Sequence, residues 1–285
     1  MTQSIRFRIR RRLFAIAACC GLSGLFTVPA MGGQGCTDTA VTVDILNNAM
    51  TAAQRVATEL DRLSVNVVVL GRMGQDLSEY HLRYSHVGFA YRDRVGAPWR
   101  IAHLLNECGT SRSDLWYEGL GNFFMDDMFR FDALVLIPPQ SIADALHPRL
   151  QQGAAMRSLF DSRYSMVAFP FSTRYQNSNA WVLETIASAE AKDAKIRNRD
   201  QAQAWLRMAE YQPSEMRIGA FKRLGGRVFK ANIAFDDHPD DLRYSGRINV
   251  VTVDSIQEFL LNRQEGWTIR ELPAVPEHSE LRSFQ

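Results

Sequence analysis

The chain has 285 residues, of which 46% are hydrophobic and 22% charged, a composition typical of a folded globular protein. Its formal net charge is +2, but the first 30 residues carry five arginines and no acidic residue, so removing these five positive charges changes the net charge to −3. The rest of the chain has no concentrated basic stripe with interleaved aromatic residues, and this excludes nucleic acid as an expected partner.

The N-terminus has the parts of a secretory signal peptide. Five arginines within residues 6–12 precede an apolar run at residues 13–28, and small residues up to Ala30 form a cleavage-site sequence. We therefore predict that residues 1–30 are a signal peptide and that the protein is periplasmic or secreted, with membrane contact only through an uncleaved signal. A transmembrane anchor is an alternative, although the apolar run is shorter than the roughly 20 residues that span a bilayer. A twin-arginine signal and a lipoprotein site at Cys19 are further alternatives.

Apolar patterns predict the elements of the first half of the chain. Apolar residues at three- and four-residue intervals predict a helix over residues 44–63 with one buried face. Segments rich in β-branched and aromatic residues, bounded by glycine or proline, predict strands. The predicted strands cover residues 65–70, 86–91, 99–105 and 133–137.

The second half of the chain alternates predicted helices and strands. Asp200 is the expected cap of one helix, and Asp254, Ser255 and Glu258 form an expected capping box for the last helix. The predicted helices cover residues 139–160, 178 onward, 200–211 and 254–262, and the predicted strands cover residues 166–171, 227–235 and 247–253. This order predicts an α+β fold with a mostly antiparallel sheet and packed helices, in a single domain at residues 31–270 with a C-terminal tail at 271–285.

Cys36 and Cys108 are the two cysteines that remain once the signal peptide is removed. In an oxidising periplasm they can form a disulfide, and the alternative is two unpaired thiols. Neither cysteine has the CxxC spacing of a metal or redox site, and two cysteines do not complete a zinc site without histidines. No cofactor is expected.

Two histidines lie on neighbouring predicted strands. In RYSHVGFAY, His86 shares one face of its strand with Gly88 and Ala90, so small residues leave space beside the imidazole. His103 lies on the next strand, in WRIAHLLN, and can hydrogen-bond across the ladder. A histidine base, a polar orienting residue and a hydroxyl at a helix start are the parts of an acyl-transfer site. The alternative is that both are ordinary half-buried histidines.

The segment RYQNSNAWVLE places three polar residues, Asn177, Ser178 and Asn179, directly before an amphipathic helix. Asparagine and serine are favoured helix caps, so the segment is either a cap or a helix start that carries a nucleophile. Asn177 and Asn179 can orient a ligand, donate to an oxyanion or form a turn.

Four segments together resemble an uncharacterised exported bacterial family, domain of unknown function 2145. They are VVVLGRMGQDLSEYHLRYSHVGFAY, WRIAHLLN, RYQNSNAWVLE and NIAFDDHP, in this order over residues 65–260. The SHVG strand and the later Tyr-x-Asn-Ser-x-x-x-Val helix start are also similar to the circularly permuted branch of the NlpC-type papain-like hydrolases. In that branch the histidine strand precedes the nucleophile helix.

The resemblance implies a permuted papain-like core in which Ser178 is the nucleophile, His86 the general base and His103 the orienting residue. It also implies ligand-binding or orienting roles for Asn177, Asn179, Tyr175 and Tyr84. Ser178 departs from the cysteine of those hydrolases, because a serine hydroxyl stays protonated until its base removes the proton during attack. The implied function is hydrolysis of an amide or ester in a cell-envelope peptide or a small acyl or amide compound.

Two other hypotheses come from different classes of protein. One is a catalytically inactive envelope module for ligand binding or assembly. The other is a metal-dependent protein centred on Asp236, Asp237 and His238, residue types that bind metal ions. This acidic loop lacks the alternating order of a calcium loop, and Pro239 favours a solvated turn between strands. The aromatic residues between 116 and 131 predict a small core or a lid under a long loop, and the alternative is a cleft-lining platform for a sugar.

Overall fold

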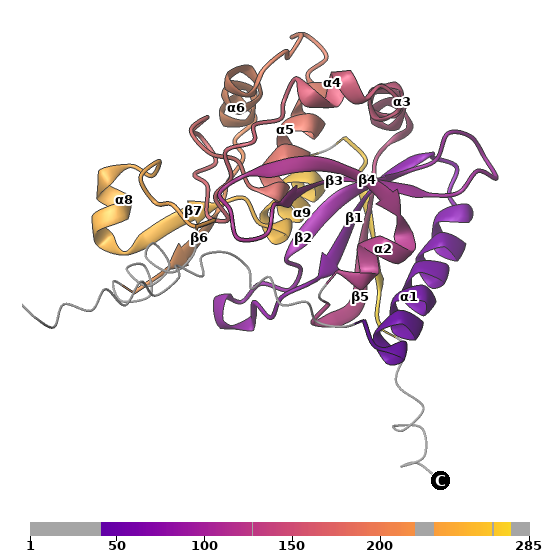
Figure 1. The fold of residues 1–285 in the computed structure, drawn as a ribbon. Helices are drawn as coiled ribbons and strands as arrows, with labels where there is room; N and C mark the ends of the chain where they lie inside the picture. The colour runs from indigo at the N-terminus through magenta and orange to yellow at the C-terminus, as the bar shows by residue number, and fades with distance from the viewer. Residues whose placement is uncertain (1–40, 127, 220–230, 264, 275–285) are drawn as a thin grey trace, which may run out of the picture. The chain divides into compact units, whose positions relative to one another are not determined.

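An antiparallel sheet of six strands organises the structure, a computed structural model that describes residues 41–126, 128–219, 231–263 and 265–274. The spatial order of the strands is β4-β3-β2-β1-β5-β8, and each neighbouring pair is antiparallel (Figure 1). The strands are β1 (Val67–Met73), β2 (His86–Tyr91), β3 (Arg100–Asn106), β4 (Ser113–Gly119), β5 (Arg130–Ile137) and β8 (Thr268–Leu272). The predicted α+β class with a mostly antiparallel sheet is confirmed.

Helices α1 (Val43–Asp61) and α2 (Leu120–Met125) cover one face of the sheet (Figure 1). Thr42 caps α1, because its hydroxyl accepts a hydrogen bond from the backbone in the first turn at 3.2 Å. The apolar stripe of α1 then faces the sheet, where Val56 is fully buried together with Phe123 of α2.

The opposite face of the sheet carries the larger core. Its main helices are α3 (Gln140–Gln151), α5 (Ser178–Glu190), α6 (Arg199–Met208) and α9 (Val253–Asn262). Trp181 of α5 is fully buried and lies edge-on to Phe89 of β2, with the ring centroids 5.6 Å apart. Because the sheet and the other helices surround α5, almost every residue along it is buried, and its start is held firmly against the sheet.

A smaller sheet lies beside the loop that leads into α5. Its strands β6 (Ser214–Arg217) and β7 (Arg247–Val250) are antiparallel, and Ile248 is fully buried in a cluster with Val167 of that loop. The remaining short elements are η1 (Ser78–Tyr80), α4 (Gly153–Arg157) and α8 (Asp240–Ser245).

Two predicted strands are wrong where the structure describes them. Residues 166–171 form turns, because their backbone groups bond to distant loops: Met166 N donates to the Asn232 carbonyl and Phe169 N to Asp237 Oδ2, both at 2.8 Å. Residues 231–235 are turn and loop, while residues 227–230 lie outside the described part of the chain. The prediction also missed β4, β6 and β8.

Helix boundaries differ from the prediction at three places. The predicted helix at residues 139–160 breaks at Gln152, whose φ of −105° and ψ of 87° are not helical. Asn198, rather than Asp200, caps α6. Thr252 caps α9 and forms a capping box with Ser255, in place of the predicted box of Asp254, Ser255 and Glu258.

The aromatic segment divides between surface and core. Trp116 and Tyr117 lie on the edge strand β4 and are 51% and 40% exposed, so they are neither core nor lid. Phe123 and Phe124 are fully buried between α1 and the sheet.

The described elements belong to one compact unit, Met31–Gln285. The predicted signal peptide and residues 275–285 lie outside the described residues. Among the helices within the described ranges, none combines the length and the apolar character needed to cross a membrane.

Candidate functional site

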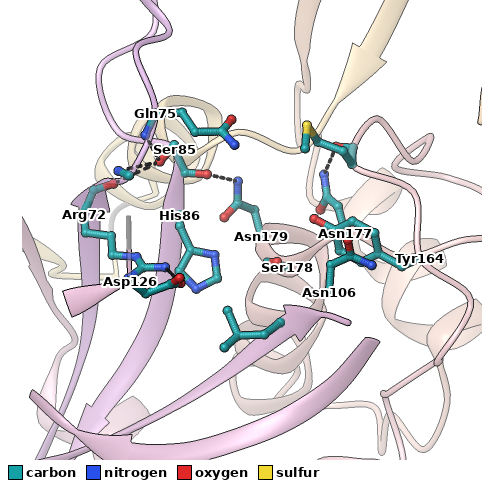
Figure 2. A pocket seen from close by; sticks show the side chains of 13 residues that line it. Arg72, Gln75, Ser85, His86, Asn106, Asp126, Tyr164, Asn177, Ser178 and Asn179 are labelled. Carbon is teal, nitrogen blue, oxygen red and sulfur yellow. Dashed lines mark hydrogen bonds and ion pairs between the residues drawn. The ribbon is translucent and has the colours of Figure 1, made fainter. Parts of the chain in front are cut away.

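A small cavity lies where one end of the sheet meets the start of α5 (Figure 2). Its volume of ≈ 110 Å³ is that of a few water molecules, enough for a carbonyl group and its nearest substituents. The lining residues are Arg72, Gly74, Gln75, Ser85, His86, Leu105, Asn106, Asp126, Tyr164, Met166, Asn177, Ser178 and Asn179. Most of these side chains are polar, so the cavity suits a polar chemical group.

His86 and His103 are in direct contact on neighbouring strands. Nε2 of His86 lies 2.9 Å from Nδ1 of His103, and the two residues are 9% and 0% exposed. The β2–β3 register pairs Phe89 with Ala102 and so places Gly88 opposite His103. A Cβ at Gly88 would lie 2.9 Å from the His103 Cβ, closer than real Cβ contacts. Glycine at this position therefore allows the two imidazoles to meet.

Ser178 is the first residue of α5 and not its cap. Asn177 is the cap, since its Oδ1 accepts a hydrogen bond from Ala180 N at 2.7 Å. Asn179 ties the helix to the sheet, because its Oδ1 accepts a hydrogen bond from Val87 N at 3.2 Å. The Ser178 hydroxyl is therefore not needed for capping, and this residue, 8% exposed, lines the cavity.

Ser178 and His86 reach the cavity from different layers of the structure. The His86 ring lies on the face covered by α2, with its centroid 6.0 Å from that of Phe123, whereas α5 packs on the opposite face. Figure 2 shows both residues at the same cavity, but no hydrogen bond joins them in the described part of the chain. The partner of the Ser178 hydroxyl is the Tyr164 hydroxyl, whose pKa is raised by burial and partly lowered by this contact.

Burial favours the neutral form of both histidines. Burial lowers the pKa of His86 well below its usual range, and the positive charge of Arg72 and the neighbouring His103 lower it further. Burial also lowers the pKa of His103, an effect that the carboxylate of Glu118 opposes. The site therefore favours neutral imidazoles over the imidazolium of a thiolate–imidazolium pair.

Several polar residues of the site were missed from the sequence, and three of them, Arg72, Tyr164 and Glu118, act on the predicted histidines or Ser178. Arg72 of β1 pairs with His86 of β2 in the sheet register, and its guanidinium donates to the Phe123 carbonyl and to Asp126. Once the β1–β2 register is known, the alternation of strand faces places Arg72 on the same face as His86. Tyr164 lies in a loop and Glu118 on the unpredicted strand β4, and nothing in their local sequence indicates a site.

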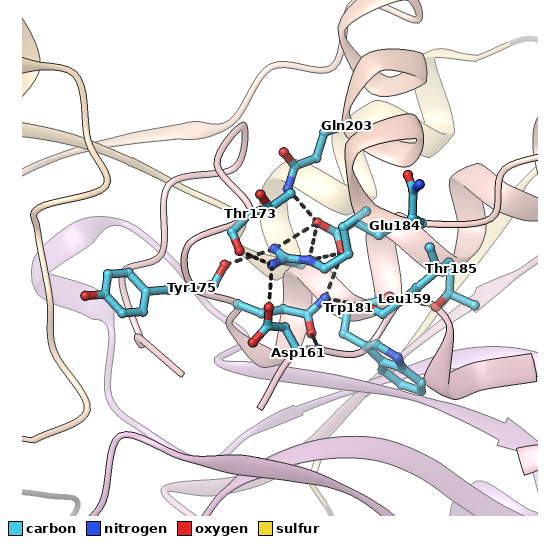
Figure 3. Close-up of polar contacts among 12 residues, drawn as sticks. Leu159, Asp161, Thr173, Tyr175, Trp181, Glu184, Thr185 and Gln203 are labelled. Atoms are coloured by element: carbon cyan, nitrogen blue, oxygen red, sulfur yellow. Dashed lines mark hydrogen bonds and ion pairs between the residues drawn. The ribbon is translucent and has the colours of Figure 1, made fainter. Parts of the chain in front are cut away.

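A buried ion pair holds the loop that precedes α5 (Figure 3). Glu184 of α5 accepts a hydrogen bond from Arg199 Nε at 2.9 Å, and Gln176 and Gln203 donate to the same carboxylate at 2.7 and 2.9 Å. Arg199 also donates to three backbone carbonyls of the loop, those of Ser172, Thr173 and Tyr175, at 3.5, 3.1 and 2.9 Å. Burial raises the pKa of the Glu184 carboxyl, and the charge of Arg199 opposes this rise. The network fixes the backbone immediately before Asn177 and Ser178.

The structure does not bring the predicted residues Tyr84 and Tyr175 to the cavity lining. Tyr84 is 2% exposed, and its hydroxyl has no hydrogen-bond partner among the described residues. Tyr175 contributes its backbone carbonyl to Arg199, and its ring lies beside the guanidinium of Arg174 at 5.5 Å. These contacts indicate that Tyr84 packs in the core and that Tyr175 is held in place through its backbone carbonyl.

The acidic loop is closed by its own contacts. Asp237 accepts from the backbone of residue 169, and its Oδ1 lies 3.1 Å from His238 Nδ1. His238 Nε2 lies 3.1 Å from the Asn249 carbonyl, and Asp236 pairs with Arg174 at 2.6 Å. These bonds engage Asp236, Asp237 and His238 with protein groups and indicate a structural role for the loop. Within the described residues, no group of three or more His, Cys, Asp or Glu side chains is placed to hold a metal ion.

Cys108, in the turn between β3 and β4, is disulfide-bonded. Cys36 lies outside the described residues, so its pairing with Cys108 stays a prediction. The Asn106 side chain closes the same turn by donating to the carbonyls of Thr110 and Arg112, at 2.9 and 2.6 Å. The disulfide is thus attached to a turn that also contributes Asn106 to the cavity.

Comparisons with curated proteins and with solved structures found no match. A family model described as "Uncharacterized protein conserved in bacteria (DUF2145)" matches residues 59–260, which is more than half of the chain. The matched range contains His86, His103 and Ser178, so the candidate site lies within the part that the family shares. The chain therefore belongs to DUF2145, a family of uncharacterized proteins conserved in bacteria.

Proposed function

We propose that the protein hydrolyses an amide or ester bond, with Ser178 as nucleophile, His86 as general base and His103 as the residue that orients His86. The observation that carries the proposal is the 2.9 Å contact between His86 Nε2 and His103 Nδ1 at the wall of a cavity that Ser178 also lines. This contact occupies Nε2 of His86, so Nδ1 is the nitrogen that can exchange a proton with a group in the cavity.

The reaction follows from these positions. The Ser178 hydroxyl turns from Tyr164 towards His86, its oxygen attacks the substrate carbonyl carbon, and its proton passes to Nδ1 of His86. His86 then gives the proton to the leaving amine or alcohol, and a water molecule, activated by the same base, hydrolyses the acyl-serine. Ser178 and Asn179 line the cavity, and their backbone N–H groups, in the first turn of α5, are the donors proposed to stabilise the oxyanion.

The electrostatics of the site support a serine rather than a cysteine nucleophile. A cysteine site depends on a thiolate paired with an imidazolium, and both burial and Arg72 oppose a charged His86. A serine site starts from a neutral imidazole that can accept a proton. The departure from the papain-like pattern at Ser178 thus agrees with the charge state of the base.

A cell-envelope peptide, or a small acyl or amide compound, is the proposed substrate class. The polar lining and the ≈ 110 Å³ volume suit a carbonyl group with polar neighbours. The signal-like N-terminus supports export to the periplasm or secretion, and the resemblance to NlpC-type hydrolases supports a peptide of the cell envelope.

One observation favours a second function. The lowered pKa of His86 makes it a weak base, and the Ser178 hydroxyl contacts Tyr164 rather than His86. Under this second proposal, the same cavity binds an envelope peptide or an acyl ligand without turnover, as a ligand-binding or assembly module.

A serine-reactive fluorophosphonate probe distinguishes the two functions. The hydrolase predicts labelling of the wild-type protein, loss of labelling in Ser178→Ala, and unchanged labelling in Ser158→Ala, which removes an exposed hydroxyl that does not line the cavity. The Ser178→Cys variant adds a second measurement: its thiol is expected to react with iodoacetamide at least about tenfold faster than the exposed thiol of Ser158→Cys, because the amides at the start of α5 and the positive charge of Arg72 stabilise a thiolate. No labelling, together with an unreactive thiol at 178, would refute the hydrolase and leave the binding module.

A further inference from the structure

Glu118 lies beside His103, on the side away from His86. The β3–β4 register pairs His103 with Trp116, so Glu118, two residues further along β4, is a diagonal neighbour of His103 on the same face of the sheet. Glu118 Oε1 lies 3.1 Å from His103 Nε2, and the Glu118 side chain is 16% exposed. The ring N–H is not well aligned with the carboxylate, so the contact is short but bent. A row of three side chains therefore crosses β4, β3 and β2 and ends at the cavity.

The row has two possible arrangements of its protons. Two neutral imidazoles in contact need one donor and one acceptor, so either His86 Nε2 donates to His103 Nδ1 or the reverse holds. If His103 carried its proton on Nδ1, the lone pair of its Nε2 would face the carboxylate of Glu118 at 3.1 Å, and two acceptors would repel each other. A proton on His103 Nε2 instead meets an acceptor. Nδ1 of His103 is then bare and accepts from His86 Nε2.

We propose that Glu118 is a positioning residue that sets the proton arrangement of both histidines, so that His86 presents a bare Nδ1 to the cavity. The consequence for catalysis rests on the proposed function, because only a bare Nδ1 can take the proton of Ser178. The proton arrangement itself exists whether or not the protein is an enzyme. Glu118 acts through two rings and does not touch the cavity lining.

The test is the ¹⁵N spectrum of the imidazoles in protein labelled at histidine, which reports the protonated nitrogen of each ring. In the wild-type protein at pH 7.5 we expect both His86 and His103 to be protonated at Nε2, with Nδ1 bare. Glu118→Ala is expected to reverse both rings or to give mixed signals. Glu118→Gln keeps an acceptor oxygen and is expected to restore the wild-type arrangement. Glu107→Gln is the matched control, because it changes an exposed carboxylate at the other end of the β3–β4 hairpin.

Fluorophosphonate labelling provides the second readout. Placing the histidine proton on the wrong nitrogen costs a serine hydrolase up to about 10⁴-fold in rate. In Glu118→Ala only part of the protein is expected to carry the wrong proton arrangement, so labelling is expected to slow by about 10- to 100-fold. Glu118→Gln should recover most of that rate. His86 protonated at Nδ1 in the wild-type protein would overturn the inference, and this observation does not require Glu118→Ala to fold. If the arrangement is as expected but no variant or wild-type protein is labelled, the inference holds and the proposed hydrolase fails.

Discussion

Gly88 offers the sharpest test of how the sheet brings the two histidines together. Replacing it with alanine adds a Cβ that would lie 2.9 Å from the His103 Cβ, 2.9 Å from Ile101 Cγ2 and 3.0 Å from the Ala102 carbonyl oxygen. Two of these neighbours are a backbone oxygen and a Cβ, which move only if the strand moves. The strand β3 must therefore shift away from β2, and the hydrogen bond between the imidazoles must lengthen.

The expected cost follows from overpacking a buried site. Added carbon atoms in a well-packed core typically cost about 1–3 kcal/mol. For a folded unit of this size, that corresponds to a fall of about 2–12 °C in Tm. Gly119→Ala is the control, because it adds the same methyl group to a glycine at the end of β4, where nothing lies within 4 Å of the added Cβ.

Urea denaturation and the fluorophosphonate probe measure the two consequences of the Gly88 change. We expect Gly88→Ala to lower the free energy of unfolding and to slow labelling of Ser178, while Gly119→Ala leaves both close to wild type. If the two variants are equally stable, the close approach of β2 and β3 at this position is not as described. If Gly88→Ala is unstable but labels normally, the contact between His86 and His103 is not needed for reactivity.

The remaining predictions concern the buried charges. Glu184→Ala leaves a buried guanidinium without its carboxylate and is expected to lower the free energy of unfolding by about 3–5 kcal/mol. The control Glu265→Ala breaks an exposed pair and is expected to cost less than about 1 kcal/mol. Equal losses in urea denaturation would show that the network does not hold the loop. The pKa values of His86 and His103 are lowered by folding, so below about pH 6.5 the unfolded chain binds more protons than the folded one. The free energy of unfolding is therefore expected to fall with decreasing pH by up to about 1.4 kcal/mol per pH unit for each histidine, and an unchanged slope in His86→Gln would contradict this account.

The strands of the sheet centre could be predicted from the sequence, whereas its edges could not. The predicted bounds of β2 are those observed, because this short and mostly apolar segment has a polar residue on each side, Ser85 and Arg92. Strand β4 lacks such a segment: Trp116 and Tyr117 are both exposed at the sheet edge, which removes the alternation. Residues 166–171 are apolar enough for a strand, but Asn232 and Asp237, distant in sequence, satisfy the backbone of that loop instead.

The same distinction applies to the candidate site. His86, His103 and Ser178 each belong to a recognisable strand or helix start, so their placement could be argued from local pattern. Arg72 and Glu118 can be assigned to the site only from the strand register, because the sequence of one strand does not show which residues of the neighbouring strand lie beside it. Tyr164 lies in a loop whose path depends on contacts with other segments.

The last part of the loop before α5 is attached to the guanidinium of Arg199, which also pairs with the carboxylate of Glu184. In a strand ladder, each backbone hydrogen bond has its own donor and acceptor, so the end of a strand can open one bond at a time. Here the carbonyls of Thr173 and Tyr175 share Arg199 as a donor, so displacement of this guanidinium by solvent would weaken both attachments. This segment, which directly precedes Asn177 and Ser178 at the cavity, is therefore expected to open locally as one unit before the sheet that carries His86.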